Sequence, residues 1–226
     1  MEIRYITFTE KGIRAINQDV FKVITCPDQH KTLFIVCDGM GGHAMGDVAA
    51  QTVCEAIASY WETNPQENDG DIKVKAACYA ASSAMDKRAD KLNCVEMGTT
   101  LVLASIEGNK VTIAHCGDSR CYLLRGGDVV YQTKDHIELS FGWEMVSKCF
   151  FSYRPEIVRP DIEQFELQPG DRIFLCSDGV YKTIAPEILT ARLMDNKPLE
   201  DVADVIKFLC EKNSDDNYTG ILVQTG

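Results

Sequence analysis

Four aspartates adjoin apolar, strand-like segments of the chain, and two of them are followed directly by glycine. A carboxylate at the end of a buried strand lies where the strand leaves the core, and a glycine beside it lets the backbone approach a neighbouring segment closely. If the strands belong to one pair of packed sheets, the four carboxylates converge at one end of it. These aspartates are Asp38 (before Gly39), Asp118, Asp178 (before Gly179) and Asp216.

Carboxylates that are brought together repel one another, and their pKa values rise unless a cation neutralises them. Oxygen ligands without accompanying Cys or His ligands favour Mg²⁺ or Mn²⁺ over zinc. Asp-Gly is a common turn, and a turn alone explains any single pair. Four aspartates that all adjoin core strands instead predict a site for divalent cations.

An arginine near the N-terminus supplies the opposite charge. Arg14 lies in residues 12–19, Gly-Ile-Arg-Ala-Ile-Asn-Gln-Asp, between two strand-like segments. Because a guanidinium group pairs with phosphate through two parallel hydrogen bonds, an arginine beside an acidic metal site is a candidate phosphate clamp. The alternative is that Arg14 is a surface arginine without a ligand.

Residues 39–44, Gly-Met-Gly-Gly-His-Ala, fit the dinucleotide-binding pattern G-x-G-x-x-A and lie between a strand-like and a helical segment. They offer an alternative from a second function class. The neighbouring segments do not have the strand–helix–strand order that this fingerprint needs, and the other aspartate turns stay unexplained. Quenching of tryptophan fluorescence by NAD would test this alternative.

Charge and composition exclude several classes of protein. The 226 residues include 34 acidic and 23 basic side chains, which give a net charge of −11. No cluster of Lys and Arg of the kind that binds a phosphate backbone is present, so we expect no nucleic-acid partner. An apolar share of 45% is ordinary for a globular domain and excludes a disordered chain.

The sequence also predicts the compartment. The first residues, Met-Glu-Ile-Arg-Tyr, are not a basic segment followed by an apolar run, so we expect no signal peptide. The apolar stretches are too short to span a membrane. The ten cysteines include no C-x-x-C pair and lie within apolar runs, which indicates buried, reduced thiols. We therefore expect a cytoplasmic protein.

Strand-like and helical segments come in blocks, which favours the α+β class with a mostly antiparallel β-sandwich covered by helices. No linker stands out, so we expect one domain over residues 1–226. The predicted strands are residues 3–9, 20–25, 32–37, 99–106, 110–116, 120–125, 129–132, 162–167, 171–176 and 218–224. The predicted helices are residues 47–61, 72–92, 186–193 and 199–212.

Seven motifs occur in an order that resembles one family. In chain order they are R-x-x-N-Q-D (14–19), D-G-M-G-G (38–42), G-T-T (98–100), G-D-S-R-x-Y (117–122), D-H (135–136), S-D-G (177–179) and D-N-x-T (216–219). Together they resemble the metal-dependent type 2C (PPM) protein serine/threonine phosphatases in their compact bacterial form. The match runs from about residue 10 to residue 223.

The resemblance implies a fold and a reaction. The fold is a four-layer αββα sandwich of two mostly antiparallel sheets flanked by helices. Two ions of Mn²⁺ or Mg²⁺, or three if a weaker site is filled, would lie at one end of it. A hydroxide that bridges two ions would attack phosphorus in line and hydrolyse phosphoserine or phosphothreonine.

The resemblance also implies the roles of individual residues. Asp38 would bridge the two metals, and the carbonyl of Gly39 would bind one of them. Asp178 and Asp216 would complete the ligands of the second metal. Asp19 would bind a metal or hold metal-bound water.

Two further residues are assigned in the same way. Asp118 matches an acidic residue at the weaker third metal site, and Arg14 would hold the substrate phosphate. The implied catalytic residues are Asp38, Asp178 and Arg14.

Three features depart from the family pattern. Met40 stands where other members carry a histidine proposed as general acid, so metal-bound water or another group, with His43 the nearest candidate, would protonate the leaving group. Gln18 occupies a position that is often Glu, which removes one acidic group near the metals. Residues 135–170 are rich in aromatic residues and predict a shortened flap. Those aromatic residues either pack into the core or form a surface for a substrate or partner.

The expected partners are phosphorylated proteins, with a cognate Ser/Thr kinase and its substrates in a signalling role, and no membrane. We expect a monomer. One alternative is a catalytically weak, phosphoprotein-binding regulator of the same fold. Another is a phosphatase of sigma-factor control, although Arg14 and residues 117–122 favour the kinase-partner subgroup.

Overall fold

Ten of the described strands form two sheets of five antiparallel strands each, and the other four form two short pairs. The computed structural model describes residues 1–26, 30–40, 45–140 and 142–226. The first sheet has the order β1 (Ile3–Glu10), β14 (Tyr218–Thr225), β13 (Arg172–Cys176), β7 (Arg120–Arg125) and β8 (Asp128–Gln132). The second sheet has the order β12 (Asp161–Glu166), β6 (Lys110–Cys116), β5 (Leu101–Glu107), β3 (Lys31–Asp38) and β2 (Asp19–Cys26).

The side chains of β3 show why the two sheets pack face to face. Leu33, Ile35 and Cys37 belong to the core under the helices, whereas Phe34 and Val36 belong to the core between the sheets. Successive side chains of a strand point to opposite faces. A strand that is covered on both faces therefore needs the continuous apolar run that the sequence has here.

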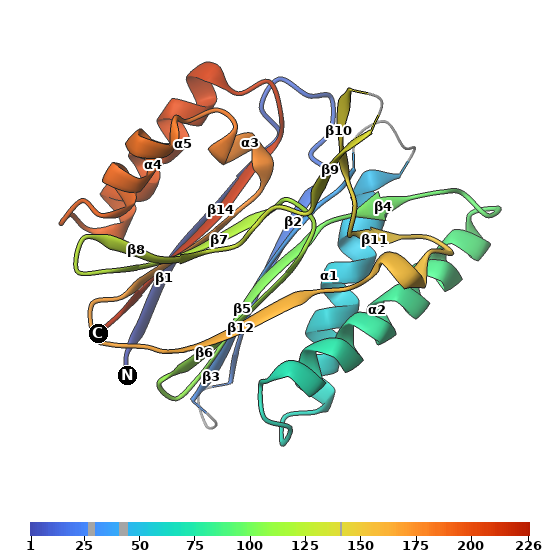
Figure 1. Ribbon diagram of the computed structural model, residues 1–226, viewed down its shortest axis with the longest axis horizontal. Helices are drawn as coiled ribbons and strands as arrows, with labels where there is room; N and C mark the ends of the chain where they lie inside the picture. Colours follow the sequence, from blue (N-terminus) through green and yellow to red (C-terminus); the bar gives the residue numbers. More distant parts are fainter. Residues whose placement is uncertain (27–29, 41–44, 141) are drawn as a thin grey trace.

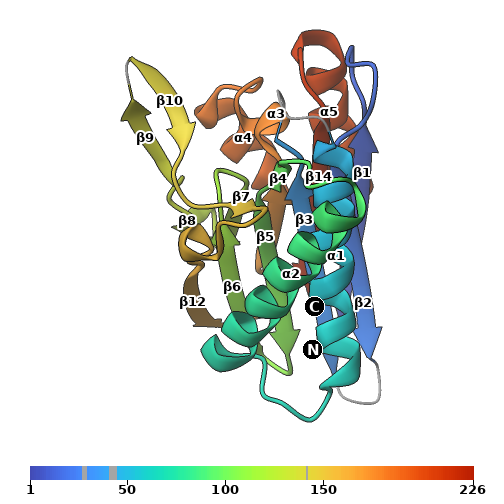
Figure 2. The same ribbon diagram turned by 90° about the vertical axis from the view of Figure 1, so that its right-hand side faces the viewer.

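Helices cover the outer face of each sheet (Figures 1 and 2). On the second sheet lie α1 (Gly46–Thr63) and α2 (Asp71–Lys91), and on the first lie α3 (Asp178–Tyr181), α4 (Pro186–Leu193) and α5 (Leu199–Asn213). This is the predicted four-layer αββα sandwich.

The predicted strands and helices are confirmed, with bounds that differ by at most two residues. One predicted strand, residues 99–106, is divided into β4 (Gly98–Thr99) and β5. The division follows from pairing, because β4 pairs with β11 (Phe150–Phe151) while β5 pairs with β3 and β6.

Residues 135–170, for which the sequence predicts a shortened flap, form short strands and a turn. The segment forms a hairpin of β9 (Ile137–Ser140) and β10 (Trp143–Val146), then β11 and a 3₁₀ turn, η2 (Pro155–Ile157). Figure 1 shows the hairpin at the end of the sandwich where α3 begins. The aromatic residues divide between the two alternatives, since Phe150 is fully buried whereas Trp143 is 77% exposed.

The surroundings of residues 39–44 exclude the dinucleotide-binding alternative. β3 pairs antiparallel with both β2 and β5, so the strand has no parallel neighbour in the described chain. α1 leads into α2 and does not cross over to a parallel strand. Residues 41–44 themselves lie outside the described residues.

Most of the cysteines are buried, as their position within apolar runs predicts. Eight of the ten cysteines are buried, and none forms a disulfide in the part of the chain that the structure describes. Among the described helices, none combines the length and apolar character needed to span a membrane.

Candidate metal centre

Strand register places two of the candidate carboxylates opposite each other. In the β2–β3 pair, Asp19 lies directly across from Asp38. The Asp38 N–H donates to Thr100 Oγ1 at 3.1 Å, and its carbonyl accepts a 2.8 Å hydrogen bond from Thr99 Oγ1. Like charges that face each other across a ladder destabilise a sheet, so this pair needs either protons or a cation.

The predicted close approach at the two Asp-Gly pairs is confirmed. A Cβ atom built on Gly179 would lie 1.9 Å from the carbonyl oxygen of Asn217. A Cβ atom on Gly39 would lie 2.3 Å from the carbonyl oxygen of Gly46. Only glycine fits at either position without moving backbone. The absence of a side chain therefore sets how closely the start of α3 approaches the start of β14.

One asparagine ties the loop between β1 and β2 to the start of β14. The Asn217 side-chain amide donates to the carbonyls of Lys11 (2.8 Å) and Ile16 (2.9 Å). Its Oδ1 accepts from the backbone N–H of Gln18 at 2.9 Å, and its own N–H donates to Asp216 Oδ1 at 2.8 Å. The side chain thus fixes the loop that carries the candidate phosphate clamp.

Asp19 carries an unpaired, buried oxygen. Its Oδ2 accepts a 2.7 Å hydrogen bond from Ser177 Oγ. Its Oδ1 is buried and has no hydrogen-bond partner among the described residues. A buried carboxylate oxygen without a partner is strongly unfavourable. A bound cation would compensate for the missing hydrogen bond, with this oxygen as one of its ligands.

A cavity of about 330 Å³ brings the site residues together. Asp19 is the one candidate residue that is not part of the described lining. The lining contains the candidate residues Arg14, Asp38, Gly39, Asp118, Asp178 and Asp216, together with Gln18, Met40, Thr100, Lys182 and four residues of the β9–β10 hairpin.

The carboxylates raise one another's pKa values. Burial is the largest effect and raises the pKa of Asp19 to about 7, against the hydrogen bond from Ser177. Burial, and then the charges of neighbouring carboxylates, raises the pKa of Asp38 well above its usual range. Burial is also the main cause that raises the pKa of Asp118 and of Asp216. A bound cation would stabilise the charged form of these carboxylates. Because all of the candidate ligand atoms are oxygens, the site fits Mg²⁺ or Mn²⁺.

Arg14 reaches the same site from the β1–β2 loop. Its Nε donates to the carbonyl of Asp215 and its Nη2 to Asp216 Oδ2, both at 2.9 Å. The side chain is 50% exposed. Its other N–H groups make no further hydrogen bond to the described residues and can meet an anion that enters the cavity.

Comparison with known proteins identifies the family. Residues 13–222 match the sequence profile described as protein phosphatase 2C. The chain belongs to the protein phosphatase 2C family.

Two relatives and one solved structure illustrate the likeness. The serine/threonine protein phosphatase PstP of Mycobacterium tuberculosis is 30% identical over 97% of this chain, which spans only 44% of that relative. The serine/threonine phosphatase stp of Listeria innocua is 30% identical, with 96% of this chain and 93% of the relative covered. The crystal structure of the PstP catalytic domain in complex with two manganese ions matches with a TM-score of 0.80 and 30% identity, over 98% of this chain and 97% of that one.

Sequence reasoning missed a lysine in this phosphatase 2C site. Lys182 Nζ donates to Asp178 Oδ2 at 2.7 Å and to Asp118 Oδ2 at 3.2 Å. The signal was available, because Lys182 follows Asp178 by four residues and a helical turn brings such pairs together. It was missed because the short helix α3 was not predicted.

The G-D-S-R-x-Y and D-H motifs form a brace next to the site. Arg120 makes two hydrogen bonds to Asp135, at 2.9 and 2.8 Å, and its guanidinium lies 3.5 Å from the ring centroid of Tyr181 in α3. His136 Nδ1 accepts a 3.2 Å hydrogen bond from the N–H of Gly117. These motifs position the loop that carries Asp118, and Asp118 is their one described residue in the cavity lining.

Residues of the β9–β10 hairpin, and residues that differ from the family pattern, also line the cavity. Ile137, Glu144, Met145 and Val146 of the hairpin line it, although the sequence did not place them there. Met40, one of the positions that depart from the family pattern, also lines the cavity. His43, the nearest candidate for the general acid, lies outside the described residues.

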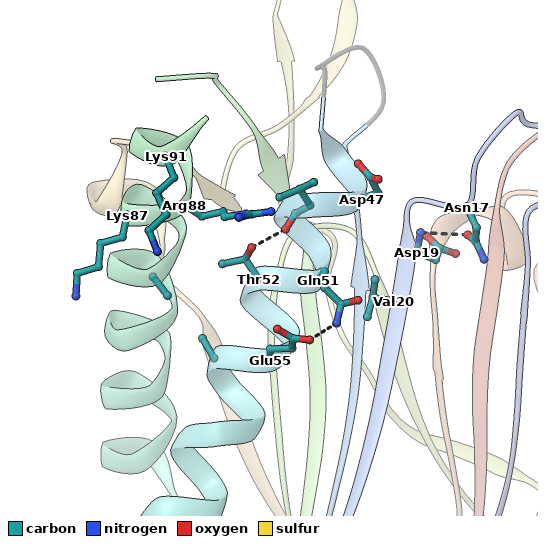
Figure 3. Close-up of a pocket in the computed structure, with 13 residues that line it drawn as sticks. Asn17, Asp19, Val20, Asp47, Gln51, Thr52, Glu55, Lys87, Arg88 and Lys91 are labelled. Atoms are coloured by element: carbon teal, nitrogen blue, oxygen red, sulfur yellow. Dashed lines mark hydrogen bonds between the residues drawn. The ribbon is translucent and has the colours of Figure 1, made fainter. Parts of the chain in front are cut away.

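A larger surface hollow, of about 880 Å³, is lined by residues of β2, α1 and α2, and Asp19 is the one candidate carboxylate in its described lining. Figure 3 shows Asp19 and Asn17 near one end, with Lys87, Arg88 and Lys91 of α2 across α1. The hollow is more open to solvent than the smaller cavity, and the convergent carboxylates line the smaller one.

Proposed function

We propose that this chain is a metal-dependent protein serine/threonine phosphatase that hydrolyses phosphoserine and phosphothreonine. The observation that carries the proposal is the convergence of acidic residues on one cavity with Arg14 at its rim. The unpaired Oδ1 of buried Asp19 adds to it. Membership of a family whose relatives are named serine/threonine phosphatases gives the substrate class.

The metal ligands proposed for Mn²⁺ or Mg²⁺ are Asp19, Asp38, Gly39, Asp178 and Asp216. The choice of metal is supported by the similar PstP catalytic domain, whose structure was solved in complex with two manganese ions. When bound, two divalent cations supply an activated water nucleophile for in-line attack and neutralise charge on the phosphate.

The chain's own residues bind and orient the substrate. Arg14 turns its free donors to the phosphate oxygens, while its bond to Asp216 fixes the direction of the guanidinium. Asn217 holds the loop that carries Arg14, so the clamp is in place before the substrate arrives. The β9–β10 hairpin closes one side of the cavity and reduces access of bulk water.

We further propose that residues 1–226 are one catalytic domain. Strands of both sheets contribute to the core between the sheets, which supports a single domain. The family match over residues 13–222, which includes strands of both sheets, supports it as well. The proposed setting is a cytoplasmic signalling pathway in which a cognate Ser/Thr kinase phosphorylates the substrates. The proposed state is a monomer.

The deciding experiment is hydrolysis of a phosphothreonine peptide with Mn²⁺ and with EDTA, for wild type and Asp178→Asn. We expect turnover that needs metal and falls more than roughly 100-fold in the variant, since even residues that only support a metal ligand account for 10- to 100-fold. Asp128→Asn, which changes an exposed aspartate of the β7–β8 turn, is the matched control.

One outcome would contradict the proposal. A folded wild type that binds Mn²⁺ and the phosphopeptide without turnover favours the phosphoprotein-binding regulator instead.

A further inference from the structure

Lys182 reaches back over the cavity from the turn that ends α3. Its backbone N–H donates to the carbonyl of Asp178 at 2.9 Å, which fixes it one helical turn beyond that aspartate. From there its ammonium contacts Asp178 Oδ2 at 2.7 Å and Asp118 Oδ2 at 3.2 Å. The two carboxylates come from different places in the chain, the β6–β7 turn and the start of α3.

The lysine binds the oxygens that a third metal ion would need. Asp118 is the residue that the family resemblance assigns to that ion, and its side chain is only 8% exposed. A Mg²⁺ ion takes its oxygen ligands at about 2.1 Å and Mn²⁺ has similar oxygen ligands. An ammonium group that already bonds the Oδ2 atoms of both aspartates therefore competes with the ion for the same ligands.

Local electrostatics favour the ammonium. A lysine so close to two carboxylates stays protonated, so it brings one positive charge that does not dissociate from the protein. A divalent ion would bring a second charge, yet it must lose most of its hydration shell to bind, which Mg²⁺ does reluctantly.

We propose that Lys182 is a built-in cation that takes the place of a third metal ion between Asp118 and Asp178. The chain then works with two divalent ions, and Lys182 is a positioning residue that orients Asp178 towards them. The inference deepens the proposed phosphatase function and rests on it.

The test is the number of Mn²⁺ ions bound per chain, measured by equilibrium dialysis with metal analysis and by electron paramagnetic resonance at saturating Mn²⁺. The probe is Mn²⁺ alone, without substrate, so the readout does not depend on activity. We expect two ions for wild type and two for Asp118→Asn, because Asp118 holds the lysine and no metal.

In the second part of the test, Lys182 is replaced by an aspartate, whose carboxylate can bind a metal ion. We expect three ions for Lys182→Asp, in which a carboxylate replaces the cation, and two again for the double variant Lys182→Asp/Asp118→Asn. Lys212→Asp makes the same charge change at an exposed position of α5 and should bind two. Circular dichroism and thermal melting confirm that each variant is folded.

Three results would overturn the inference, and they separate it from the proposed function. Three ions in wild type, one of them lost in Asp118→Asn, would mean that the metal displaces Lys182, while the phosphatase proposal stands. Two ions in folded Lys182→Asp would mean that the lysine does not exclude a third ion. No Mn²⁺ bound by wild type would overturn the metal centre and this inference together.

Discussion

Arg14 pairs with an acidic residue of the site that it is proposed to serve. Its ion pair with Asp216 has side-chain exposures of 50% and 37%. Exposed ion pairs of this kind contribute about 0–1 kcal/mol to stability. The pair therefore orients the guanidinium more than it stabilises the fold, and the value of Arg14 lies in what it does to a phosphate.

Replacement of Arg14 by alanine separates these two contributions. We expect kcat/KM for a phosphothreonine peptide to fall roughly 100-fold, as when one preorganised donor to a developing charge is removed. The free energy of unfolding should change by less than about 1 kcal/mol. Steady-state kinetics and urea denaturation measure the two effects.

Arg4→Ala, at an exposed position of β1, is the matched control and should change neither quantity. A kcat/KM for Arg14→Ala within twofold of wild type would mean that the arginine serves the Asp216 pair alone.

At the scale of elements, the site is built where strands and helices end. Asp38 ends β3, Asp178 begins α3 and Asp19 begins β2, while Asp216 lies just before β14. Elements with packed cores fix these ends in space, so the carboxylates keep their positions despite their mutual repulsion. The glycines after two of them allow the ends to come close.

The far end of the second sheet has a buried ion pair that joins α1, α2 and β5. Lys73 and Asp69 are both 1% exposed at the side chain and lie 2.8 Å apart. Asp69 also accepts hydrogen bonds from Trp61 Nε1 (3.0 Å) and from Ser105 Oγ. Lys31 is a second, more distant cation, at 3.6 Å.

Lys73→Met should lower the free energy of unfolding by about 3 kcal/mol, because it leaves the buried carboxylate of Asp69 with a single distant cation. Urea denaturation measures it. Lys75→Met removes a pair with Asp71 of the same spacing and the same 2.8 Å distance, but exposed by 62% and 56%. It should change stability by less than about 0.5 kcal/mol. Equal effects of the two variants would contradict the importance of burial.

The sequence allows prediction of those elements whose pattern is fixed by a core. β3 and β13 each contain a continuous apolar run, residues 33–37 and 173–176, because both faces are covered, and an Asp-Gly pair follows each run. The hairpin around Trp143 could not be predicted, since exposed strands need no apolar alternation. Lys182 was missed because a four-residue helix has no periodicity, and its partner Asp118 is distant in sequence.

At the scale of the whole molecule, the carboxylate cluster links stability to pH and to metal. Burial raises the pKa of Asp19 to about 7 in the folded chain, and it raises that of Asp38 well above its usual range. In the unfolded chain an aspartate titrates near pH 3.9. At pH values between the unfolded and the folded pKa, the folded chain binds more protons than the unfolded chain. The free energy of unfolding therefore falls as pH rises through this range.

For the metal-free protein we therefore expect the melting temperature to fall as pH rises from about 4 to about 7. Mn²⁺ should raise the melting temperature more at pH 8 than at pH 5, because protons compete with the ion at the lower pH. Thermal melts in EDTA and in Mn²⁺ measure both effects. Asp19→Asn should flatten the pH dependence in EDTA. A slope that is unchanged in that variant would place the titrating groups elsewhere.

Strand β14 pairs with β1 and with β13, and Asn217 just before it anchors the loop of Arg14. Of the described strands, β1 leaves the ribosome before the others, whereas β14, the strand that pairs with it, leaves after them. A chain that stops short of residue 216 has a gap in its first sheet, lacks one of the proposed metal ligands and leaves Arg14 on a loop without its Asn217 anchor. The fold thus makes the proposed site depend on the last strand of the described structure, so that a partly synthesised chain lacks a complete site.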